Sequence, residues 1–531
     1  MTAHCVAAQL PALPDHDRPD QTTGMREECG VFAILRPEAA DVARDAYYAL
    51  YSLQHRGQES CGIVVNDDGV FTNHRDLGIV GDVFTSERLA NLGTGEMACG
   101  HVRYGTTATG GRINAQPLVV NHIKGVMAIA HNGNLTNAVE LRQEQELRGS
   151  IFHTTSDTEV IAYEITASRL TSSSIEEAIE KAMPRLEGAY SLVVLSPQKM
   201  VGVRDPRGFR PLCIGRLSDG GYTIASESCA LDAVGATFVR DVEPGEIVVV
   251  DRDNSIDDDD ARPERKGPLR IRSIRTHCET KQHAACVFEY IYFARPDSIM
   301  DGTSVHEARK RAGEYLAMDH PVDADIVIGV PDSGLDAAMG YSRQSKIPYD
   351  TGFIKNKYIG RTFISPHQEN RERGVRIKLN PVSSVVKGKR VVLVDDSIVR
   401  GTTSARIIKL LHEAGAKEVH MRVSAPPFIN PCYYGTDIDS QENLIACRMS
   451  EDEIREHIGA DTLGYLSVRR ARTIAEPDAS IKGFCSACFD GNYPTRKPSD
   501  QPLDRFRTRI RGGQPKDEPA RNLSAVKEAR K

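Results

Sequence analysis

The first half of the chain alternates short apolar runs with turn residues, which is the hydrophobic pattern of β-strands. Helical periodicity is rarer there: apolar residues spaced three or four apart between Val42 and Leu53 mark one helix. The sequence from Ser156 to Glu159 has the form of a capping box and opens a second helix that reaches residue 170. Many strands with few helices predict sheets that pack on each other and are covered by helices. Strand-like runs occur at residues 31–35, 61–65, 97–103, 126–131, 191–195 and 246–250.

A charged stretch at residues 251–266 interrupts this pattern, with acidic residues followed by basic ones, as is typical of a solvated linker or loop. After it, apolar strands alternate with helices. Residues 325–330 lead through a Pro-Asp-Ser-Gly turn into a helix. Residues 390–394 lead through a hydroxyl-rich loop into another helix, and residues 418–424 form the next strand. This alternation predicts a parallel, doubly wound sheet, in which ligands bind at the loops that leave the carboxyl ends of the strands.

The length of 531 residues exceeds what one hydrophobic core holds, so we expect two substantial domains. We place the first at residues 29–260 and the second at 261–498, between a leader (1–28) and a polar, Arg-rich tail (499–531) that we expect to be disordered. The leader lacks the basic and apolar regions of a secretory signal, and Met25 is an alternative start.

Composition and charge exclude several classes of protein. The chain has no apolar run long enough to span a membrane, and its net charge of −6 gives no basic excess for a nucleic-acid partner. We therefore expect a cytoplasmic protein without a membrane or nucleic-acid partner. In that reducing compartment, its 12 cysteines are expected to be free, catalytic or metal-bound rather than disulfide-paired.

The stretch from Arg390 to Ser404 carries the clearest binding chemistry. A buried strand delivers two adjacent carboxylates, Asp395 and Asp396, to its end, and a Gly- and hydroxyl-rich loop then leads into a helix. Backbone N–H groups of such a loop bind phosphate, helped by the helix dipole. The carboxylates would repel a phosphate, so they suit sugar hydroxyls or a hard cation such as Mg²⁺. The alternative is that Asp-Asp merely ends a strand and Thr-Thr caps a helix without any ligand.

This loop resembles the signature of type I phosphoribosyltransferases, which bind phosphoribosyl pyrophosphate. The resemblance implies that Asp395 and Asp396 hold the ribose hydroxyls and that the following loop holds the 5′-phosphate. Residues 329–334 look like the pyrophosphate loop, and family members place Mg²⁺ near the positions matching Ser333, Asp395 and Asp396. Residues 355–364 resemble a lid, which would keep water from an oxocarbenium-like transition state. The other implied binding residues are Ser397, Arg400, Gly401, Thr402, Asp332, Ser333, Gly334 and Lys355.

Cys29 begins the first predicted strand, directly after the leader. A cysteine at a chain terminus can be activated by its own α-amine, whose ordinary pKa of ~7.7–8 suits a general base. This mechanism requires cleavage between Glu28 and Cys29, because an acylated nitrogen cannot accept the proton. The alternative is a buried structural cysteine near a strand.

The residues that follow Cys29 favour the catalytic interpretation. Together with it they resemble the N-terminal-nucleophile glutamine amidotransferases, and the resemblance implies that Cys29 is the nucleophile. It also implies that the side-chain amide of Asn132 and the backbone N–H of Gly133 form the oxyanion hole for thioester formation. The matching segments, in order, are residues 54–60, 101–106, 131–135 and 155–159.

The same resemblance supplies a clamp for the amino acid. Arg103 matches the residue that binds the glutamine α-carboxylate, and Asp157 matches the one that binds its α-amine. Arg56 either orders the site or is an ordinary surface or core-lining arginine.

Both halves together resemble one family, the glutamine phosphoribosylpyrophosphate amidotransferases, from Cys29 to about Pro498. The implied fold is an N-terminal-nucleophile hydrolase αββα sandwich followed by a type I phosphoribosyltransferase doubly wound parallel sheet. The implied reaction hydrolyses glutamine to glutamate and ammonia, then transfers the ammonia to phosphoribosyl pyrophosphate, giving 5-phosphoribosylamine and pyrophosphate. This is the first committed step of de novo purine biosynthesis. By the same resemblance we expect feedback inhibition by purine nucleotides and a homotetramer or homodimer.

Four cysteines suggest a metal centre. Cys485 and Cys488 form a C-x-x-C pattern that suits redox chemistry, zinc or chance. With Cys286 and Cys432 they match the branch of the family that carries a [4Fe–4S] cluster on four cysteines and a propeptide. Zinc on four cysteines is the rival, since spacing alone cannot separate the two.

Two other functions stay open. Another glutamine amidotransferase, such as one that makes amino sugars, would share the first half of the chain, but residues 395–402 are specific to a ribosyl 5′-phosphate. A regulatory protein that senses phosphoribosyl pyrophosphate without catalysis would not need Cys29, Asn132 and Asp157 in order.

Overall fold

The computed structural model describes residues 29–104, 111–252, 267–358, 379–436, 438, 441–475 and 481–498. The predictions for the leader (1–28), for most of the charged linker (253–266) and for the tail (499–531) lie outside the described residues. So does most of the predicted lid, from residue 359 onward.

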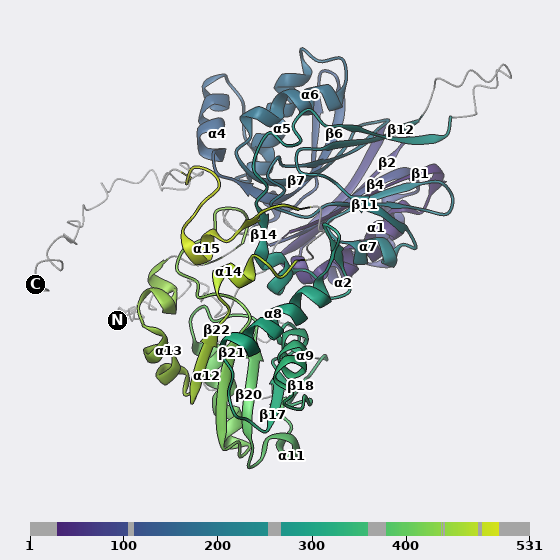
Figure 1. The fold of residues 1–531 in the computed structure, drawn as a ribbon. Helices are drawn as coiled ribbons and strands as arrows, with labels where there is room; N and C mark the ends of the chain where they lie inside the picture. Colours follow the sequence, from purple (N-terminus) through teal and green to yellow (C-terminus); the bar gives the residue numbers. More distant parts are fainter. Residues whose placement is uncertain are drawn as a thin grey trace, which may run out of the picture. The chain divides into compact units, whose positions relative to one another are not determined.

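The described chain divides into two units. The N-terminal unit comprises Cys29–Gln282 together with Tyr433–Gly435 and residues 495–498. The C-terminal unit comprises His283–Cys432 and Thr436–Pro494. Figure 1 labels the helices and strands of both units.

Two sheets form the centre of the N-terminal unit. The first has seven strands in the order β11-β9-β10-β1-β4-β2-β3, and the second has six in the order β13-β12-β8-β7-β6-β5. The strands are β1 (Gly30–Ala40), β2 (Ser60–Asp67), β3 (Val70–Leu77), β4 (Gly95–Arg103), β5 (Leu118–His122), β6 (Gly125–Leu135), β7 (Gly188–Leu195), β8 (Met200–Arg204), β9 (Cys213–Arg216), β10 (Tyr222–Ala225), β11 (Thr237–Asp241), β12 (Ile247–Arg252) and β13 (Leu269–Ile274). The helices are α1 (Val42–Ser52), α2 (Val80–Val83), α3 (Ser86–Leu92), α4 (Ala138–Leu147), α5 (Asp157–Arg169), α6 (Ile175–Ala182) and α7 (Ser228–Ala233).

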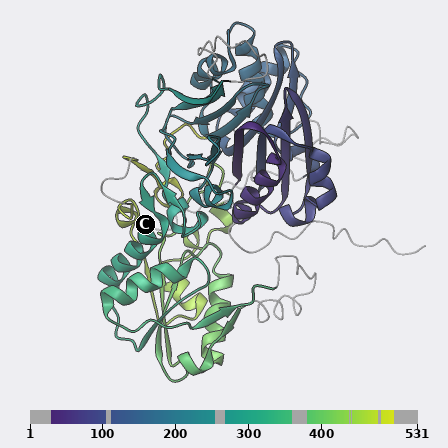
Figure 2. The same cartoon turned by 90° about the vertical axis from the view of Figure 1, so that its right-hand side faces the viewer.

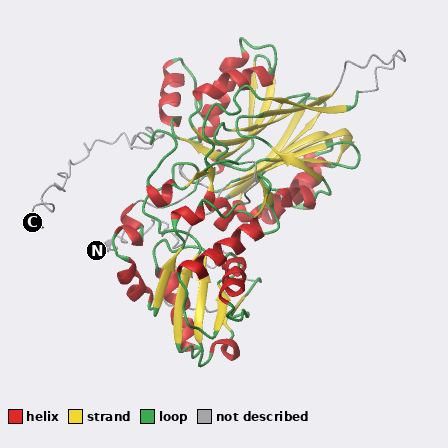
Figure 3. Cartoon of the chain, viewed as in Figure 1, coloured by secondary structure: helices red, strands yellow, loops and turns green. Residues whose placement is uncertain are grey.

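Alternation along the strands explains how these elements form layers. On β1, Val31 and Ala33 point into the core between the two sheets, whereas Phe32 and Ile34 point to the outer face, which α1 and α7 cover. The outer face of the second sheet packs on α5 and α6 through residues such as Ile161. Helices therefore lie outside both sheets (Figures 1 and 3). This order of layers is the predicted αββα sandwich.

The N-terminal unit extends beyond the domain boundary predicted at residue 260. β13 pairs antiparallel with the whole of β12, from Ile247 opposite Ile274 to Arg252 opposite Leu269. The charged stretch between them therefore connects two strands of one sheet rather than two domains. The unit continues to Gln282.

The C-terminal unit is built on a parallel sheet in the order β17-β20-β21-β22. One face of this sheet packs on α8 and α9, and the other packs on α12 and α13 (Figures 1 and 2). This is the predicted doubly wound arrangement. The strands are β14 (Ala285–Cys286), β15 (Ile299–Met300), β16 (Thr303–Ser304), β17 (Ile326–Gly329), β18 (Phe353–Lys355), β19 (Leu379–Pro381), β20 (Arg390–Asp395), β21 (Glu418–Val423), β22 (Thr462–Tyr465) and β23 (Phe484–Cys485). The helices are α8 (Val305–Asp319), α9 (Gly334–Ser345), α11 (Ser383–Val386), α12 (Thr402–Glu413), α13 (Glu451–Ile458), α14 (Val468–Ala471) and α15 (Ala487–Asp490).

Among the described residues, no helix has both the length and the apolar character needed to cross a membrane.

Candidate active sites

Cys29 lies at the beginning of β1, where its neighbours fix the backbone. The next residue, Gly30, pairs with Val102 of β4, and the Cys29 thiol lies 3.7 Å from the carbonyl oxygen of Tyr104. The Arg56 Nε donates a hydrogen bond to the carbonyl oxygen of Cys29 at 3.0 Å. Arg56 is fully buried, so it is not a surface arginine, and its bond to Cys29 supports an ordering role.

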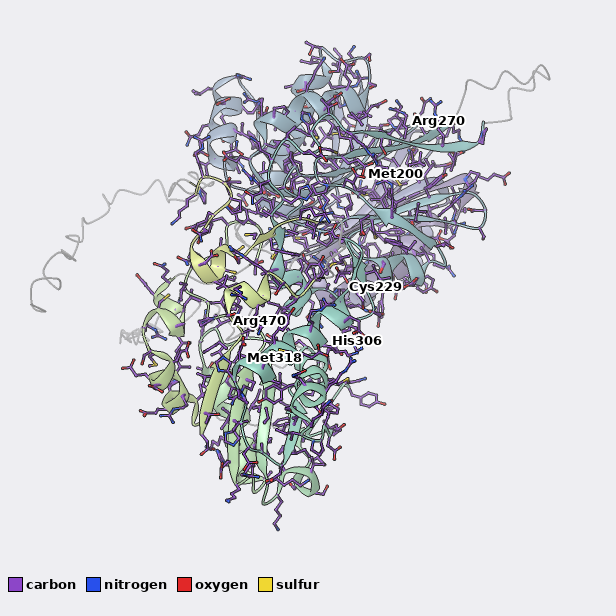
Figure 4. All side chains as sticks on the ribbon, viewed as in Figure 1. Met200, Cys229, Arg270, His306, Met318 and Arg470 are labelled. Atoms are coloured by element: carbon purple, nitrogen blue, oxygen red, sulfur yellow. The ribbon has the colours of Figure 1, made fainter. Side chains whose placement is uncertain are left out.

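A carboxylate that sequence analysis missed, Glu227, holds Arg56 in place. Its Oε1 lies 2.6 Å from Nη1 of Arg56 and 2.7 Å from Nε2 of His55. The side chains of Arg56 and Glu227 are both fully buried, and a buried guanidinium is strongly destabilising without such a partner. The thiol of Cys229, labelled in Figure 4, lies 3.7 Å from the second oxygen of Glu227. Glu227 therefore acts on the Cys29 backbone through Arg56, across a sequence separation of 171 residues that no local motif marks.

The predicted oxyanion hole lies on β6 of the second sheet. The Asn132 side chain is only 1% exposed, and its Nδ2 has no hydrogen-bond partner among the described residues. A buried donor without an acceptor costs about 1–3 kcal/mol, so such a group in a native protein calls for an explanation. Gly133 has φ +141°, and a Cβ there would lie 2.2 Å from the carbonyl oxygen of Ala189, so only glycine fits. The unpartnered amide is the kind of donor that a developing oxyanion needs.

His101 joins the two sheets next to this donor, and sequence analysis gave it no role. Its Nε2 lies 2.9 Å from the carbonyl oxygen of His131, and because a carbonyl only accepts, Nε2 carries the proton. Burial lowers the pKa of His101 to about 3, so the ring stays neutral near pH 7. His101 pairs with Val31 on β1, and His131 precedes Asn132 on β6. This bond therefore connects the sheet that contains the strand after Cys29 to the strand that carries Asn132.

Arg103 and Asp157 supply opposite charges in the same unit. Arg103 ends β4, is 5% exposed, and its Nη1 lies 3.5 Å from Oε1 of Glu59. Asp157 begins α5, and its Oδ2 accepts a hydrogen bond from the backbone N–H of Leu135 at 2.9 Å. Burial by itself raises the pKa of Asp157, but His131, the Leu135 N–H and Arg103 together bring it below its ordinary value. Asp157 therefore remains an anion, which suits an ammonium group of a ligand. The positive charge of Arg103 lies nearby and suits a carboxylate of the same ligand.

The start of α5 differs in detail from the predicted capping box. Ser156 is the N-cap, as predicted, but its hydroxyl accepts from the N–H of Thr158 at 3.2 Å. The carboxylate of Glu159 turns away from Ser156 and accepts from the backbone N–H groups of His153 and Thr154. The reciprocal cap does not form because Glu159 instead holds the loop that precedes Asp157.

Asp395 and Asp396 form a buried carboxylate pair at the end of β20. Each is 7% exposed, and the hydroxyls of Ser333 and Ser397 both donate hydrogen bonds to Asp396. Burial, and then the charge of Asp396, raises the pKa of Asp395 well above its ordinary value. Burial also raises the pKa of Asp396, against the hydrogen bonds from Ser333 and Ser397. Such a pair is costly unless hydroxyl donors or a cation reach it. The structure thus brings together the three residues predicted to lie near Mg²⁺.

The loop after this pair leaves the beginning of α12 open. The N-cap of α12 is Gly401, with φ +80°, and no side chain caps the helix. The alternative in which the Thr402–Thr403 hydroxyls cap the helix is therefore not what the structure shows. A Cβ on Gly401 would also lie 2.6 Å from Cδ1 of Ile445, so both conformation and space require glycine. The N–H groups of the first turn are directed at the loop, as phosphate binding requires. Arg400 directly precedes Gly401 and is partly buried.

The predicted pyrophosphate loop lies between β17 and α9, beside the carboxylate pair. A Cβ on Gly334 would lie 2.5 Å from the carbonyl oxygen of Val394, so glycine permits the loop to approach the end of β20. Asp332 in this loop forms an ion pair with Lys355, the last residue of β18. The structure therefore places Asp332, Ser333, Gly334 and Lys355 in one neighbourhood.

Four cysteines of the C-terminal unit lie near one another. Cys286 and Cys485 are paired in the short parallel strands β14 and β23. Burial raises the pKa of Cys488 well above its ordinary value, and the charges of Cys432, Cys286 and Cys485 add to that effect. None of the described cysteines forms a disulfide bond. No three His, Cys, Asp or Glu side chains within the described ranges are arranged to hold a single metal ion.

Comparisons with known proteins agree with the two kinds of site. The sequence profile of the family described as glutamine amidotransferase domain matches residues 107–233, and that described as phosphoribosyl transferase domain matches residues 305–440. The amidophosphoribosyltransferase of Methanocaldococcus jannaschii is 48% identical over 479 residues, which is 90% of this chain and 100% of the relative. That of Bacillus subtilis is 48% identical over 483 residues, or 90% of this chain and 97% of the relative.

A solved structure with a similar fold has a description that agrees with these relatives. It is described as glutamine phosphoribosylpyrophosphate (PRPP) amidotransferase from B. subtilis complexed with ADP and GMP. Its TM-score to this chain is 0.79 at 47% identity, covering 90% of this chain and 99% of that one.

Proposed function

This chain belongs to the amidophosphoribosyltransferase family, and on that premise we propose which of its residues carry out each part of the reaction. The reaction is glutamine-dependent amidotransfer to phosphoribosyl pyrophosphate in purine biosynthesis. The observation that carries the proposal is the buried amide donor of Asn132, which has no partner in the described part of the chain and lies in the unit that begins with Cys29. Such a donor is costly in the resting protein but useful once a glutamine carbonyl oxygen becomes negative.

Cys29 is the nucleophile in this proposal. Its free α-amine takes the thiol proton, and the sulfur attacks the side-chain carbonyl carbon of glutamine. Asn132 Nδ2 and the Gly133 N–H donate to the resulting oxyanion, each worth about 2.7–4 kcal/mol of transition-state stabilisation. The amine returns the proton to the departing nitrogen, so that ammonia leaves and a thioester remains. Water then attacks the thioester, gives a proton back to the sulfur, and releases glutamate.

The amino acid end of glutamine is bound by the charges described above. Arg103 binds the α-carboxylate and Asp157 binds the α-ammonium, which fixes the side-chain amide in front of the Cys29 thiol. The support for this assignment is the lowered pKa of Asp157, which keeps it anionic, together with the nearby guanidinium of Arg103. Arg56, held by Glu227, positions the Cys29 backbone.

The ribosyl substrate binds the C-terminal unit. Asp395 and Asp396 accept hydrogen bonds from the ribose hydroxyls, and the α12 N-terminus with Ser397, Arg400, Gly401 and Thr402 binds the 5′-phosphate. Residues 332–334 and Lys355 bind the pyrophosphate group. The bond from C1 to the pyrophosphate oxygen breaks, the ammonia lone pair forms the new C1–N bond, and one proton leaves the nitrogen. Mg²⁺, held near Ser333, Asp395 and Asp396, would neutralise charge on the departing pyrophosphate.

The ribosyl assignment is tested by changing Asp395→Asn together with Asp396→Asn. We expect the double variant to lose synthesis of phosphoribosylamine from both glutamine and free ammonia, while glutamine hydrolysis measured alone persists. Asp323→Asn is the matched control, because Asp323 is exposed and pairs with Arg390 at the opposite end of β20. A double variant that still made phosphoribosylamine would contradict the assignment.

We also propose a [4Fe–4S] cluster on Cys286, Cys432, Cys485 and Cys488. The residues fit such a group, since the four thiols lie close enough for each of the other three to act on Cys488. A zinc ion needs sulfurs at about 2.3 Å from one centre, whereas a four-iron cluster separates its thiolates further. The cluster would join three distant segments of the unit and stabilise it.

The metal proposal is tested by analysis of anaerobically purified protein. We expect a brown protein with iron and sulfide, and a lower Tm together with loss of iron in Cys485→Ser. Cys278→Ser, outside the four-cysteine set, is the matched control. A colourless protein that contains stoichiometric zinc would decide for the rival metal.

Further proposals concern processing and partners. Removal of residues 1–28 follows from the chemistry, because only a freed amine on Cys29 can act as base; the intact mass of the active protein tests it. Purine nucleotides are proposed as feedback ligands, supported by the ADP and GMP bound to the B. subtilis structure. The homotetramer or homodimer and the cytoplasmic location expected from the sequence stay predictions.

A further inference from the structure

A short segment from the second half of the chain packs in the N-terminal unit. Tyr433–Gly435 belongs to the same unit as Cys29–Gln282, although Cys432 and Thr436 on either side belong to the C-terminal unit. The segment has no role in the reaction proposed above. Its contacts lie at the strand that carries the oxyanion hole.

The first set of contacts fixes the segment to the framework of the second sheet. Arg210 is fully buried, and its Nε and Nη2 both donate to the carbonyl oxygen of Tyr434, at 3.1 and 2.7 Å. The ring of Phe209 stacks on that of Tyr434, with centroids 4.2 Å apart and planes inclined by 20°. The carbonyl oxygen of Arg210 accepts from the hydroxyl of Ser191, the residue of β7 that pairs with Asn132. A continuous set of contacts thus leads from Tyr434 to the partner strand of Asn132.

The second set of contacts is direct. Gly435 lies so close to the oxyanion-hole strand that a Cβ on it would be 3.3 Å from both Cα and the carbonyl carbon of Gly133. The Nδ2 of Asn134 donates to the carbonyl oxygen of Tyr433 at 3.1 Å. A Cβ on Gly133 would in turn be 2.2 Å from the carbonyl oxygen of Ala189. Gly133 is therefore held between β7 and the backbone of the inserted segment.

We propose that Tyr433–Gly435 positions the oxyanion hole, by holding Gly133 so that its N–H and the Asn132 amide converge on the same oxygen. The inference rests on the proposed roles of Asn132 and Gly133. Oxyanion donors work only within about 2.7–3.1 Å of the oxygen, and a displacement of about 1 Å can cost about 100-fold in rate. These three residues are positioning residues. Glutamine hydrolysis would then depend on a segment encoded some 300 residues after the strand that it supports.

The test is Gly435→Ala, measured as glutamate release. The added methyl group would lie 3.3 Å from Gly133 and from Nη2 of Arg210, so Gly133 should shift by a few tenths of an ångström. We therefore expect kcat to fall about 4- to 10-fold. The KM for glutamine should stay within about twofold, because Arg103 and Asp157 are not touched, and synthesis from free ammonia should be unchanged. Gly149→Ala is the matched control: Gly149 has φ +93°, compared with +110° at Gly435, but a Cβ there would meet nothing within 4 Å. It carries the same backbone strain without the contact, and we expect wild-type kcat.

A second pair of variants keeps the test decisive if Gly435→Ala folds poorly. Asn134→Ala removes the side-chain bond to Tyr433, together with a longer one to the carbonyl oxygen of Leu135, and should lower kcat by a smaller factor. Asn121→Ala is its matched control, because Asn121 is an exposed residue of β5. It should behave as wild type.

Two further measurements separate positioning from general disturbance. Alkylation of Cys29 by iodoacetamide needs the thiolate but no oxyanion hole, so its rate should be the same in Gly435→Ala and wild type. A glutamine analogue with an aldehyde in place of the amide forms a tetrahedral thiol adduct, so its inhibition constant should weaken in proportion to kcat.

The inference would be overturned by a Gly435→Ala enzyme with kcat within twofold of wild type. It would equally be overturned if alkylation and KM deteriorated together with kcat. Failure of the proposed nucleophile would appear separately, as glutamine hydrolysis by Cys29→Ala, and would remove the basis of the inference.

Discussion

Replacement of Asn132 by alanine gives the sharpest test of the amidotransferase site, because it separates activity from stability. Most buried polar side chains serve the fold, so that their loss lowers both. The Asn132 amide nitrogen is buried and has no partner within the described part of the chain. Its loss should therefore affect a bound oxyanion far more than the resting protein.

The magnitudes follow from the surroundings of the side chain. Loss of one oxyanion donor lowers kcat by about 10²- to 10³-fold, which corresponds to about 2.7–4 kcal/mol. For stability, removal of an unsatisfied donor recovers about 1–3 kcal/mol of desolvation cost, and the small cavity left by the truncated side chain opposes it by a similar amount. The net change should be within about 1 kcal/mol. For a unit of this size, that is a Tm change below about 4 °C.

The assay compares glutamate release, ammonia-dependent synthesis and thermal unfolding of Asn132→Ala with those of the wild type. Glutamate release should fall by about 10²- to 10³-fold, whereas ammonia-dependent synthesis and the Tm should hardly change. Asn121→Ala is the matched control, since Asn121 is an exposed residue of β5 next to the same strand. The reasoning is refuted if Asn132→Ala keeps kcat within threefold, or if its Tm falls by 10 °C together with activity.

Two other predictions concern buried charges. Glu227→Gln leaves the Arg56 guanidinium without a buried counter-charge and should cost up to about 3–5 kcal/mol of stability and lower glutamate release. The double change Arg56→Met with Glu227→Leu should recover stability in thermal unfolding. It should not recover activity, because the carbonyl oxygen of Cys29 still lacks the hydrogen bond from Arg56. Recovery of activity as well would contradict a positioning role. At the second site, the raised pKa of Asp395 means that ionisation of the pair opposes folding of the ligand-free protein above the ordinary carboxyl pKa. Asp395→Asn should therefore raise the Tm at pH 7–8, with the difference shrinking as the pH falls towards about 4; a difference that did not depend on pH would argue against this.

Much of the fold was predictable because its signals are local. The apolar runs at residues 31–35 and 126–131 correspond to β1 and β6, and the helix start at Ser156 is where the pattern placed it. The adjacent carboxylates followed by a glycine-rich loop mark the end of β20 and the beginning of α12. Each of these features needs only a short window of sequence to be recognised.

The features that sequence analysis missed all depend on contacts across long stretches of chain. The pairing of β13 with β12 extends the first unit beyond residue 260, and the charge pattern of residues 251–266 carries no sign of that pairing. Glu227 reaches Arg56, and His101 joins two sheets, without any local pattern that marks them. Membership of Tyr433–Gly435 in the N-terminal unit depends on packing alone.

We propose that one chain produces ammonia at Cys29 and uses it at a separate site, the carboxylate pair of β20. The most direct measurement is synthesis of phosphoribosylamine by Cys29→Ala, with glutamine or with free ammonia as nitrogen donor, beside an exposed-cysteine control, Cys447→Ala. We expect no product from glutamine, wild-type rates from ammonia, and an unaffected control. Persistent synthesis from glutamine, or loss of both activities together, would contradict it.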